Sequence, residues 1–582
     1  MVKIHFCFVS LSKIGKMKKF LLIVLNLACV LGISEAYSFF HSELIDVIEI
    51  SEGENIENQG ENTFFELPLL EVPSIYRGNL GLKEFAVFVE ESNADVLEGH
   101  YLSLEEEVSD TIAFRLHLES ENLHFVSRDK DICLHLSELQ TDFGQIEGYV
   151  QHSFLNSTHF SFSPYDVPQF VEYDSARYQR TMFEVQRIEK VRFANVDGYW
   201  TDFDEHKNSF GNMLLLLNLV LNVHDLELYM DVYLPKNDPL AKRPFVMLIH
   251  GGSFYYGSRK DLTVSSLCEH LASLGYVAAS IDYRIGFRPT KKGIERTGYS
   301  AIQDAHAAMR FITSNQSAFG IDTSMMFVGG CSAGSITALG LAFMTNETRP
   351  MSTRKSLLYS ELGDIETSGN SINAHFSLKG VVDMWGAMPS LEMLEGENIP
   401  VVAFHGDADD IVPYGYDYPF CKTNQIKKLL FNKMYGSSCI VAKEKELGVK
   451  SELYTFWGYK HAPQLTDNSL NDNYYFIQDK MCAFLDEIIR TEKPQIVKRN
   501  GWYQVDGEVC QYNWTAEGGL IIETKHGEAK VVWIGNAPKN ELKVSGIQKH
   551  GIGFTQEIRI NKTIGNGQEN IKSRNQGFEK TT

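Results

Sequence analysis

Three runs of consecutive apolar residues in the middle of the chain predict strands that are buried on both faces. They are Pro244–Ile249, Met325–Gly329 and Pro400–Phe404. Unbroken apolar runs of this length are typical of parallel sheets, because helices cover both sides of each strand. A mainly apolar segment of helical length, Ser335–Met344, follows the second run. We therefore expect an α/β fold with a mostly parallel central sheet and helices on both faces.

On either side of this region, apolar and polar residues alternate, which predicts strands with one solvent-exposed face. These runs are Thr111–Leu118, His159–Phe162, Gly519–Thr524 and Lys530–Ile534. We expect four parts, namely a leader (1–36), a β-rich accessory module (37–190), an α/β domain (191–495) and a β-rich C-terminal segment (496–582). Roughly the last thirty residues, which are rich in Gly, Asn, Gln and Lys, are expected to form a mobile tail.

Length and charge limit the classes of protein that fit. The chain has 582 residues, more than one domain usually contains, and 43% of them are hydrophobic, enough for a large core. Its formal net charge of -21 disfavours nucleic acid and anionic membranes as partners. Acidic residues are dense between Glu43 and Glu121, which indicates a well-solvated exterior. The oligomeric state is left open.

The N-terminal residues resemble an export signal. Lys18 and Lys19 precede the apolar run Phe20–Ile33, and small residues at the usual cleavage spacing follow in Ser34–Ala36. A retained anchor is the alternative, but this run is interrupted by Asn26 and is short for a bilayer span. We expect a secreted or periplasmic chain without a stable membrane anchor.

Cysteine usage is compatible with export. Removal of Cys7 and Cys29 with the leader leaves seven cysteines, so a monomer has at least one free thiol. Cys331 is the expected free cysteine, as a small buried residue. Cys421 and Cys439 either form a disulfide or stay reduced, and the sequence does not decide between these alternatives.

The segment Gly330–Gly334, with the sequence Gly-Cys-Ser-Ala-Gly, fits a sharp turn that joins a buried strand to a helix. The turn needs small residues at both ends, and Gly330 and Gly334 supply them. Ser332 at its tip is therefore a candidate nucleophile. A serine hydroxyl becomes a good nucleophile only when a base removes its proton, so the hypothesis requires a histidine and an acid that orients it.

Residues of both types follow Ser332, first the acids and then the histidine. The run Pro400–Phe404 leads into a loop with three carboxylates, and composition alone does not select one of them. They are Asp407, Asp409 and Asp410. An alternating strand, Glu452–Phe456, then leads to His461, the expected base. His405 precedes the acids at a strand end and is expected to be a hydrogen-bonded structural residue.

A glycine-containing loop follows the first apolar run. Its residues are His250, Gly251, Gly252 and Ser253. Glycines at this position let backbone N–H groups face a substrate, and loss of one such donor raises the barrier to acyl transfer by about 3 kcal/mol.

Together, the turn at Ser332, the acid loop, His461 and the loop from His250 resemble the α/β-hydrolase superfamily. The resemblance is to secreted carboxylesterases with a His-Gly-Gly motif, related to the hormone-sensitive-lipase-like esterases. It extends to Leu228–Pro235, Ala279–Arg284 and Gln303–Arg310. Asp304 and His306, in the last of these segments, are expected to be structural.

The resemblance selects individual residues. In the family's His-Gly-x-x-Asp-x-x-Val-Pro pattern the acid is four residues after the histidine, which here is Asp409. The resemblance also implies that the oxyanion is bound by the backbone N–H groups of Gly252, Ser253 and Ala333. The chain departs from the common Gly-Gly-Gly run at Ser253, where the backbone donor is retained and a side chain is added.

The implied activity is that of a serine carboxylic-ester hydrolase with an acyl-enzyme intermediate. No cofactor is expected, because the chain has neither a trusted metal-ligand spacing nor a glycine-rich phosphate loop. A serine peptidase of the prolyl-oligopeptidase type is one alternative, although the N-terminal module is short for its propeller. A non-catalytic binding relative is the other, although such relatives usually lack a member of the triad.

The sequence gives less information about substrate preference than about the reaction. The aromatic residues Tyr255, Tyr256, Trp385 and Tyr414 could wall a pocket or serve in packing. The segment Asn346–Asn373 is the expected lid, and its polar composition favours small or carbohydrate-linked esters over triacylglycerol.

Overall fold

The structure is a computed structural model. It describes residues 74–92, 96–119, 122–127, 130–134, 136–142, 145–153, 156–201, 223–356, 359–420, 430–490, 494–525, 527–560 and 572–573. The expected leader lies outside these residues. In the described part of the chain, no helix has both the length and the hydrophobicity required to cross a membrane.

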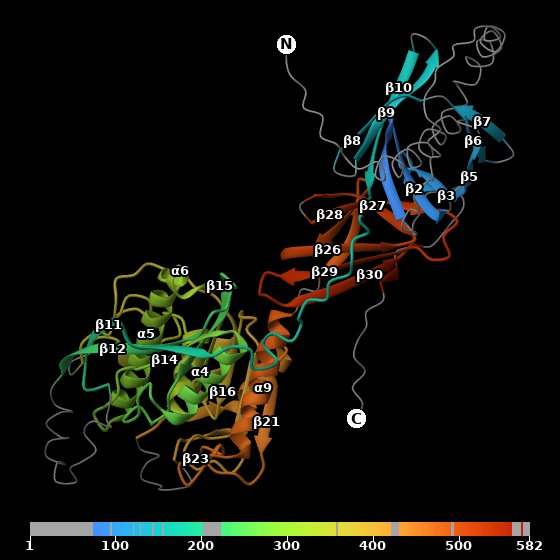
Figure 1. Cartoon of the computed structure of the whole chain (residues 1–582). Helices are drawn as coiled ribbons and strands as arrows, with labels where there is room; N and C mark the ends of the chain where they lie inside the picture. The colour runs from blue at the N-terminus through green and yellow to red at the C-terminus, as the bar shows by residue number, and fades with distance from the viewer. Residues whose placement is uncertain are drawn as a thin grey trace, which may run out of the picture. The chain divides into compact units, whose positions relative to one another are not determined.

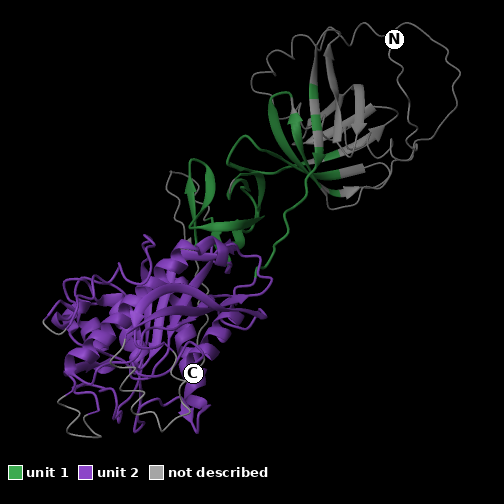
Figure 2. Ribbon diagram, turned by 90° about the vertical axis from the view of Figure 1, so that its left-hand side faces the viewer, with its two compact units in different colours: residues 1–173, 494–546, 554–582 green, residues 174–493, 547–553 purple. Residues whose placement is uncertain are grey.

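The chain divides into two compact units, drawn in different colours in Figure 2. The first comprises Met1–Tyr173, Pro494–Gly546 and Phe554–Thr582, and the second comprises Asp174–Lys493 and Ile547–Gly553. Residues from before and after the α/β region therefore fall in one unit.

The second unit is built on an eight-stranded sheet in the order β11-β12-β14-β13-β15-β16-β18-β21. Its strands are β11 (Val185–Gly198), β12 (His224–Pro235), β13 (Arg243–Ile249), β14 (Val277–Ile281), β15 (Ile321–Cys331), β16 (Leu378–Met384), β18 (Val401–Gly406) and β21 (Glu452–Phe456). β12 is antiparallel to both of its neighbours, and all pairs from β14 to β21 are parallel. The three predicted buried strands are β13, β15 and β18, which confirms the mostly parallel sheet.

Helices cover both faces of this sheet, as Figure 1 shows. The helices are α4 (Leu262–Leu274), α5 (Lys291–Ser314), α6 (Gln316–Phe319), α7 (Ala333–Phe343), α8 (Ser437–Glu446) and α9 (Asp472–Ile489). α4 and α9 pack with Val246 and Leu248 of β13, whereas α5, α7 and α8 belong to the core cluster that contains Phe245 and Met247. This division follows from the alternation of side chains along a strand. The predicted α/β-hydrolase architecture is therefore confirmed.

The ends of the helices follow from local sequence. Asp261 caps the N-terminus of α4 by accepting hydrogen bonds from the backbone N–H groups of Thr263 and Val264. Gly275 ends this helix with φ 107°, a conformation that costs glycine little. Ser332 is the N-cap of α7, yet its side chain makes no capping hydrogen bond. Its hydroxyl is therefore not used by the helix.

The second unit also has short elements that surround the ends of the main strands. They are β17 (Ala387–Met388), β19 (Tyr416–Asp417), β20 (Met434–Gly436), β22 (Leu465–Thr466), β23 (Ser469–Leu470) and the 3-10 turns η2 (Met351–Thr353) and η3 (Leu391–Leu394). β17, β20 and β19 form a small three-stranded sheet in that order.

The first unit is β-rich, as the alternating pattern predicted. One antiparallel sheet has the order β7-β6-β5-β3-β2-β1-β10-β9-β8, and two others have the orders β24-β25-β28-β27 and β26-β29-β30-β31, with β4 pairing β28. The strands are β1 (Ser74–Leu80), β2 (Lys83–Ser92), β3 (Val96–Ser103), β4 (Val108–Ser109), β5 (Ile112–Glu119), β6 (Asn122–Ser127), β7 (Lys130–Leu134), β8 (Leu136–Asp142), β9 (Gln145–Ser153), β10 (Asn156–Pro164), β24 (Gln495–Arg499), β25 (Trp502–Asp506), β26 (Val509–Glu517), β27 (Gly519–Lys525), β28 (Glu528–Ile534), β29 (Glu541–Gln548), β30 (Gly553–Arg559) and β31 (Lys572–Ser573).

The expectation of a mobile tail was wrong at its beginning. Gly553–Arg559 forms β30, and Phe554 and Ile558 are buried in a core cluster with Trp514 and Trp533. Burial of these two apolar side chains stabilises the strand despite the polar composition around them. Residues 561–571 and 574–582 lie outside the described part.

Candidate active site

The chain makes the sharp turn at Ser332 that its sequence predicted, and the backbone there is strained. Ser332 adopts φ 55° and ψ -119°, between the end of β15 and the start of α7. A Cβ atom on Gly334 would lie 2.1 Å from the carbonyl oxygen of Ile249, and one on Gly330 would lie 2.4 Å from the carbonyl carbon of Gly334. Only glycine fits at either position, and the turn places Ser332 at the carboxyl end of the sheet.

Ser332, His461 and Asp409 lie in one hydrogen-bonded row. His461 Nε2 is 2.9 Å from Ser332 Oγ, and His461 Nδ1 is 2.7 Å from Asp409 Oδ2. They follow β15, β21 and β18, whose carboxyl ends meet at one edge of the parallel sheet. The ring of Trp385 packs edge-on to His461 with centroids 6.4 Å apart. The structure thus brings together three residues that the sequence separates by up to 129 positions.

Asp409 is held as a carboxylate. It also accepts hydrogen bonds from the backbone N–H groups of Ile411 and Val412, at 2.8 and 3.0 Å. Burial acts to raise the pKa of the Asp409 carboxyl, but hydrogen bonds from His405 and His461 outweigh it and hold this pKa well below its usual range. An ionised Asp409 accepts the Nδ1–H proton of His461, which leaves the Nε2 lone pair facing Ser332.

The other two carboxylates of this loop have different partners. Asp407 accepts a hydrogen bond from the backbone N–H of Gly458 at 2.6 Å, and Asp410 pairs with Lys460 at 3.3 Å. Of the three, Asp409 is the one whose carboxylate contacts His461 in the described structure.

The loop from His250 to Ser253 passes beside Ser332. A Cβ atom on Gly251 would lie 3.4 Å from Ser332 Cβ, so the two backbones approach closely. Gly252 has φ 115°, and a Cβ atom there would lie 1.9 Å from the carbonyl oxygen of Tyr256. Ser253 also has a positive φ, of 53°, and it lines the same cavity as Ser332 and Ala333.

The side chain of His250 holds this loop in place. Its side chain is buried, Nδ1 lies 2.6 Å from the carbonyl oxygen of Gly251, and its ring stacks on Tyr283 at 4.4 Å. Tyr283 Oη in turn donates a hydrogen bond to the carbonyl oxygen of His250 at 3.0 Å. His250 and Gly251 therefore support the loop rather than face the cavity.

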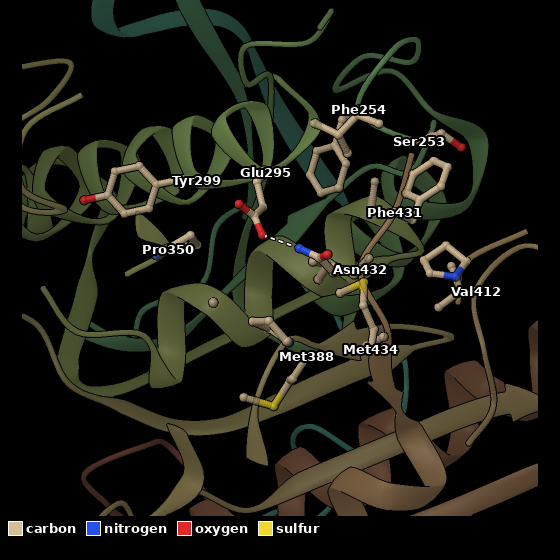
Figure 3. Close-up of a pocket in the computed structure, with 18 of the residues that line it drawn as sticks. Ser253, Phe254, Glu295, Tyr299, Pro350, Met388, Val412, Phe431, Asn432 and Met434 are labelled. Atoms are coloured by element: carbon tan, nitrogen blue, oxygen red, sulfur yellow. Dashed lines mark hydrogen bonds between the residues drawn. The ribbon is translucent and has the colours of Figure 1, made fainter. Parts of the chain in front are cut away.

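A cavity of about 340 Å³ opens beside Ser332. Its walls come from α5, α7, β17 and the residues around β20, and Figure 3 shows Phe254, Met388 and Met434 around it. Most of the residues that line it are apolar.

The aromatic residues proposed as pocket walls do not line this cavity. Trp385 is 1% exposed and packs in the core, and Tyr414 Oη is 2.7 Å from Thr455 Oγ1. Of the described residues in the expected lid, Asn346–Asn373, only Pro350 lines the cavity. Its cover instead includes β17 and residues from 411–420 and 430–434.

Several residues that were expected to be structural are confirmed in that role. Asp304 is fully buried and pairs with Arg284, whose Nη2 is 2.7 Å from Asp304 Oδ1. His306 is 8% exposed, and burial together with the charge of Arg310 lowers the pKa of His306 to about 3, so this imidazole is neutral. Cys331 is a buried free cysteine whose Sγ lies 3.8 Å from Met384 Sδ.

The disulfide alternative is only partly addressed by the structure. Cys439 is free, and Cys421 lies outside the described residues. The described residues also contain no group of three or more His, Cys, Asp or Glu side chains that could hold a metal ion.

Sequence reasoning did not find the residues that shape the cavity. Met388, Phe431 and Met434 lie in connecting segments with no periodic pattern, so no local signal marks them. It also did not find the buried carboxylate of Asp383, which accepts hydrogen bonds from Ser335 Oγ and Ser437 Oγ at 2.6 Å each.

Comparison with known proteins adds independent information. A sequence model of the BD-FAE family matches residues 230–398. Gut esterase 1 from Caenorhabditis elegans is 30% identical over 129 residues, which are 21% of this chain and 22% of that protein. Esterase LipC from Mycobacterium tuberculosis is 31% identical over 105 residues, 18% of this chain and 24% of that protein. The chain thus spans less than a quarter of the length of these curated relatives.

Among solved structures, the apo form of Thermogutta terrifontis esterase 2 is 19% identical, with 46% of this chain and 92% of that chain covered and a TM-score of 0.34. The segment that matches BD-FAE contains both the His250 loop and Ser332, and it ends before Asp409. With the strand order of its sheet, this match supports an α/β-hydrolase fold, and over part of its length the chain is similar to esterases.

Proposed function

We propose that this chain is a serine carboxylic-ester hydrolase in which Ser332, His461 and Asp409 form the catalytic triad. The observation that carries the proposal is the row of short hydrogen bonds from Ser332 Oγ through both nitrogens of His461 to Asp409. A row of this kind lets a hydroxyl lose its proton while an oriented imidazole gains it.

The mechanism follows from these contacts. His461 Nε2 takes the proton of Ser332 as the serine oxygen attacks the ester carbonyl, and Asp409 stabilises the imidazolium that forms. Backbone N–H groups of Gly252, Ser253 and Ala333 stabilise the negative oxygen of the tetrahedral intermediate. The imidazolium then protonates the leaving alcohol, and water repeats the sequence to release the acid from Ser332.

We propose small or carbohydrate-linked esters as substrates. A cavity of about 340 Å³ is at the lower end of the range for ligand pockets, which suits a small ester better than a triacylglycerol. The names of the relatives, gut esterase 1 and esterase LipC, support ester chemistry over the peptidase alternative. The row of hydrogen bonds at Ser332 argues against a non-catalytic binding relative.

The test compares hydrolysis of p-nitrophenyl acetate, its longer acyl homologues and a peptide p-nitroanilide. Ser332→Ala is expected to lower kcat by at least a thousandfold, and Asp409→Asn by about ten-thousandfold, because the wrong tautomer of His461 results. Asp407→Asn is the matched control, since it removes a carboxylate from the same loop that does not contact His461. If wild type does not differ from Ser332→Ala on any substrate, the hydrolase proposal fails. Faster cleavage of the anilide would favour the peptidase.

We further propose that the mature chain is exported, on the strength of the basic and apolar residues in 18–36. Mass spectrometry of the N-terminus of the natural protein tests this proposal. A mature chain that begins at or near Tyr37 is expected, and an intact N-terminus on an intracellular chain would contradict export.

A further inference from the structure

We propose that the acyl half of the substrate is an unbranched, apolar chain of medium length, held in the cavity beside Ser332. This inference rests on the proposed ester hydrolase function and adds the class of acyl group. It depends on three features of the cavity, namely its position relative to His461, its direction along α7 and the chemistry of its walls.

The position of the cavity indicates that it holds the acyl group rather than the leaving alcohol. Ser332, Ala333 and Ser253 line it, whereas His461 is not among the described residues that do. The leaving alcohol must receive its proton from His461 Nε2, so the alcohol lies on the side of that ring. The group that stays bonded to Ser332 is the acyl group, which therefore occupies the space on the other side of the nucleophile.

The cavity follows the length of one helix. α7 and its two caps contribute Ser332, Ile336, Gly340 and Met344, which are spaced four residues apart and therefore lie on one helix face. From first to last they span about 18 Å, given a rise of 1.5 Å per residue. Lining residues spread over this length leave more room than an acetyl group fills, and enough for an extended alkyl chain of medium length that starts at the serine.

The walls of the cavity are suited to an alkyl chain. Methionine side chains from three short elements line it, and their flexibility lets them pack against a chain of variable shape. They are Met388, Met393 and Met434. Among the polar residues that line it, Glu295 and Asn432 bond to each other, with Asn432 Nδ2 donating to Glu295 Oε1 at 2.7 Å (Figure 3). Lys291 and Lys433 also line the cavity. Each buried methylene is expected to raise kcat/KM by about fourfold.

Gly298 of α5 marks unfilled space in this cavity. It lines the cavity, and the nearest atom to a Cβ built on it is Phe254 Cζ at 3.8 Å. Gly340 of α7 differs, because a Cβ atom there would lie 2.2 Å from Ile302 Cδ1. A side chain at Gly298 would therefore extend into the cavity without a clash at its Cβ, and a large one would shorten the space for the acyl chain.

The experiment measures kcat/KM for p-nitrophenyl esters from acetate to laurate, each below its critical micelle concentration. The concentration of active sites is determined by labelling with a fluorophosphonate. Wild type is expected to prefer octanoate to acetate by at least about a hundredfold. Gly298→Leu is expected to lower kcat/KM for octanoate at least tenfold and to change that for acetate less than threefold. Lys292→Leu is the matched control, because it adds leucine to an exposed position of the same helix that does not line the cavity.

The outcomes separate this inference from the function on which it rests. Wild type that hydrolyses acetate with an equal or higher kcat/KM than octanoate overturns the acyl inference and leaves the hydrolase intact. The acyl inference is also overturned if Gly298→Leu and Lys292→Leu have the same ratio of kcat/KM for octanoate to kcat/KM for acetate. Failure of all esters, without fluorophosphonate labelling of Ser332, instead overturns the hydrolase.

A second measurement covers the case in which Gly298→Leu does not fold. Alkylboronic acids bind a catalytic serine as analogues of the tetrahedral intermediate and need no leaving group. Octylboronic acid is expected to inhibit wild type at least about a hundredfold more tightly than methylboronic acid, with a smaller ratio for Gly298→Ala. Equal inhibition of wild type by the two acids would overturn the inference.

Discussion

His405 Nε2 lies 3.3 Å from Asp409 Oδ2, the same oxygen that lies 2.7 Å from His461 Nδ1. On its other side, His405 Nδ1 lies 2.7 Å from Ser437 Oγ, and Ser437 Oγ donates to Asp383 Oδ2 at 2.6 Å. His405, Ser437 and Asp383 are all fully buried. A continuous row of polar groups therefore joins the candidate acid to a second buried carboxylate.

The hydrogen bonds of this row meet at His405. Ser437 donates its one hydroxyl proton to Asp383, so its oxygen can accept a hydrogen bond from His405 Nδ1. His405 Nε2 faces two acceptors, Asp409 Oδ2 and the carbonyl oxygen of Val412 at 3.4 Å. Through its two nitrogens, His405 thus connects Asp409 to Ser437.

Replacement of His405 by asparagine is expected to lower kcat about tenfold and to leave KM nearly unchanged. His405 does not line the cavity, and a hydrogen bond to a charged group contributes about 1.5 kcal/mol or more. Loss of the hydrogen bond from His405 should also raise the pKa of Asp409. Because a protonated Asp409 no longer orients His461, the drop in activity on the acid side of the pH profile is expected to shift to higher pH. Initial rates from pH 4 to 9 measure both effects.

Ser437→Ala serves as the companion variant, because it breaks the row one step farther from Asp409. Its loss of kcat is expected to be smaller than that of His405→Asn. If His405→Asn lowers only thermal stability and leaves the pH profile unchanged, His405 acts in packing and does not position Asp409.

The parts of the candidate site that depend on local backbone geometry could be predicted from the sequence. Gly330 and Gly334 are required by contacts of 2.4 and 2.1 Å that any Cβ atom would make, so the turn leaves a signature in the sequence. The order of acid and base is similarly tied to strand ends. The cavity wall has no such signature, because Met388 and Phe431 are brought together by long-range packing. The pairing of N-terminal and C-terminal strands in one unit is likewise a long-range property.

Relief of backbone strain at Ser332 is expected to stabilise the protein. Ser332 has φ 55° and ψ -119°, a conformation that costs a residue with a side chain about 1 to 3 kcal/mol and costs glycine little. Ser332→Gly should therefore have a higher free energy of unfolding than Ser332→Ala by about 1 kcal/mol. Both variants lack the hydroxyl, so the comparison isolates the backbone. Urea denaturation measures it, and equal stability of the two variants would mean that the turn is not strained.

The buried pair of Arg284 and Asp304 makes a different prediction about stability. Asp304 accepts hydrogen bonds from both the backbone N–H and the Nε of Arg284, at 2.8 and 3.0 Å. Asp304→Ala would leave the guanidinium buried without its partner, which is expected to lower the free energy of unfolding by about 3 to 5 kcal/mol. Asp410→Ala, at an acid whose partner Lys460 is 74% exposed, is the control and is expected to change it by less than about 1 kcal/mol. Thermal denaturation compares the two variants.

Glu444 of α8 gives the protein a pH-dependent stability. Its side chain is fully buried, Oε2 accepts a hydrogen bond from Ser451 Oγ at 3.4 Å, and Oε1 has no hydrogen-bond partner among the described residues. Burial raises the pKa of Glu444 from its ordinary value of 4.5 to about 7. Below pH 4.5 the carboxyl is protonated in both the folded and the unfolded chain. Between pH 4.5 and 7 the unfolded chain ionises first, so the free energy of unfolding falls as the pH rises.

Glu444→Gln removes this ionisation and is therefore expected to gain stability relative to wild type as the pH rises. The gain should reach about 3 kcal/mol at pH 8, which corresponds to a shift of roughly 2.5 units at 1.36 kcal/mol each, and should disappear near pH 4. Glu446→Gln, at an exposed position of the same helix, controls for the loss of a negative charge. Urea midpoints between pH 4 and 8 measure the difference. Because only a buried acid couples ionisation to folding in this way, a difference that does not vary with pH would mean that Glu444 is ionised in the folded protein.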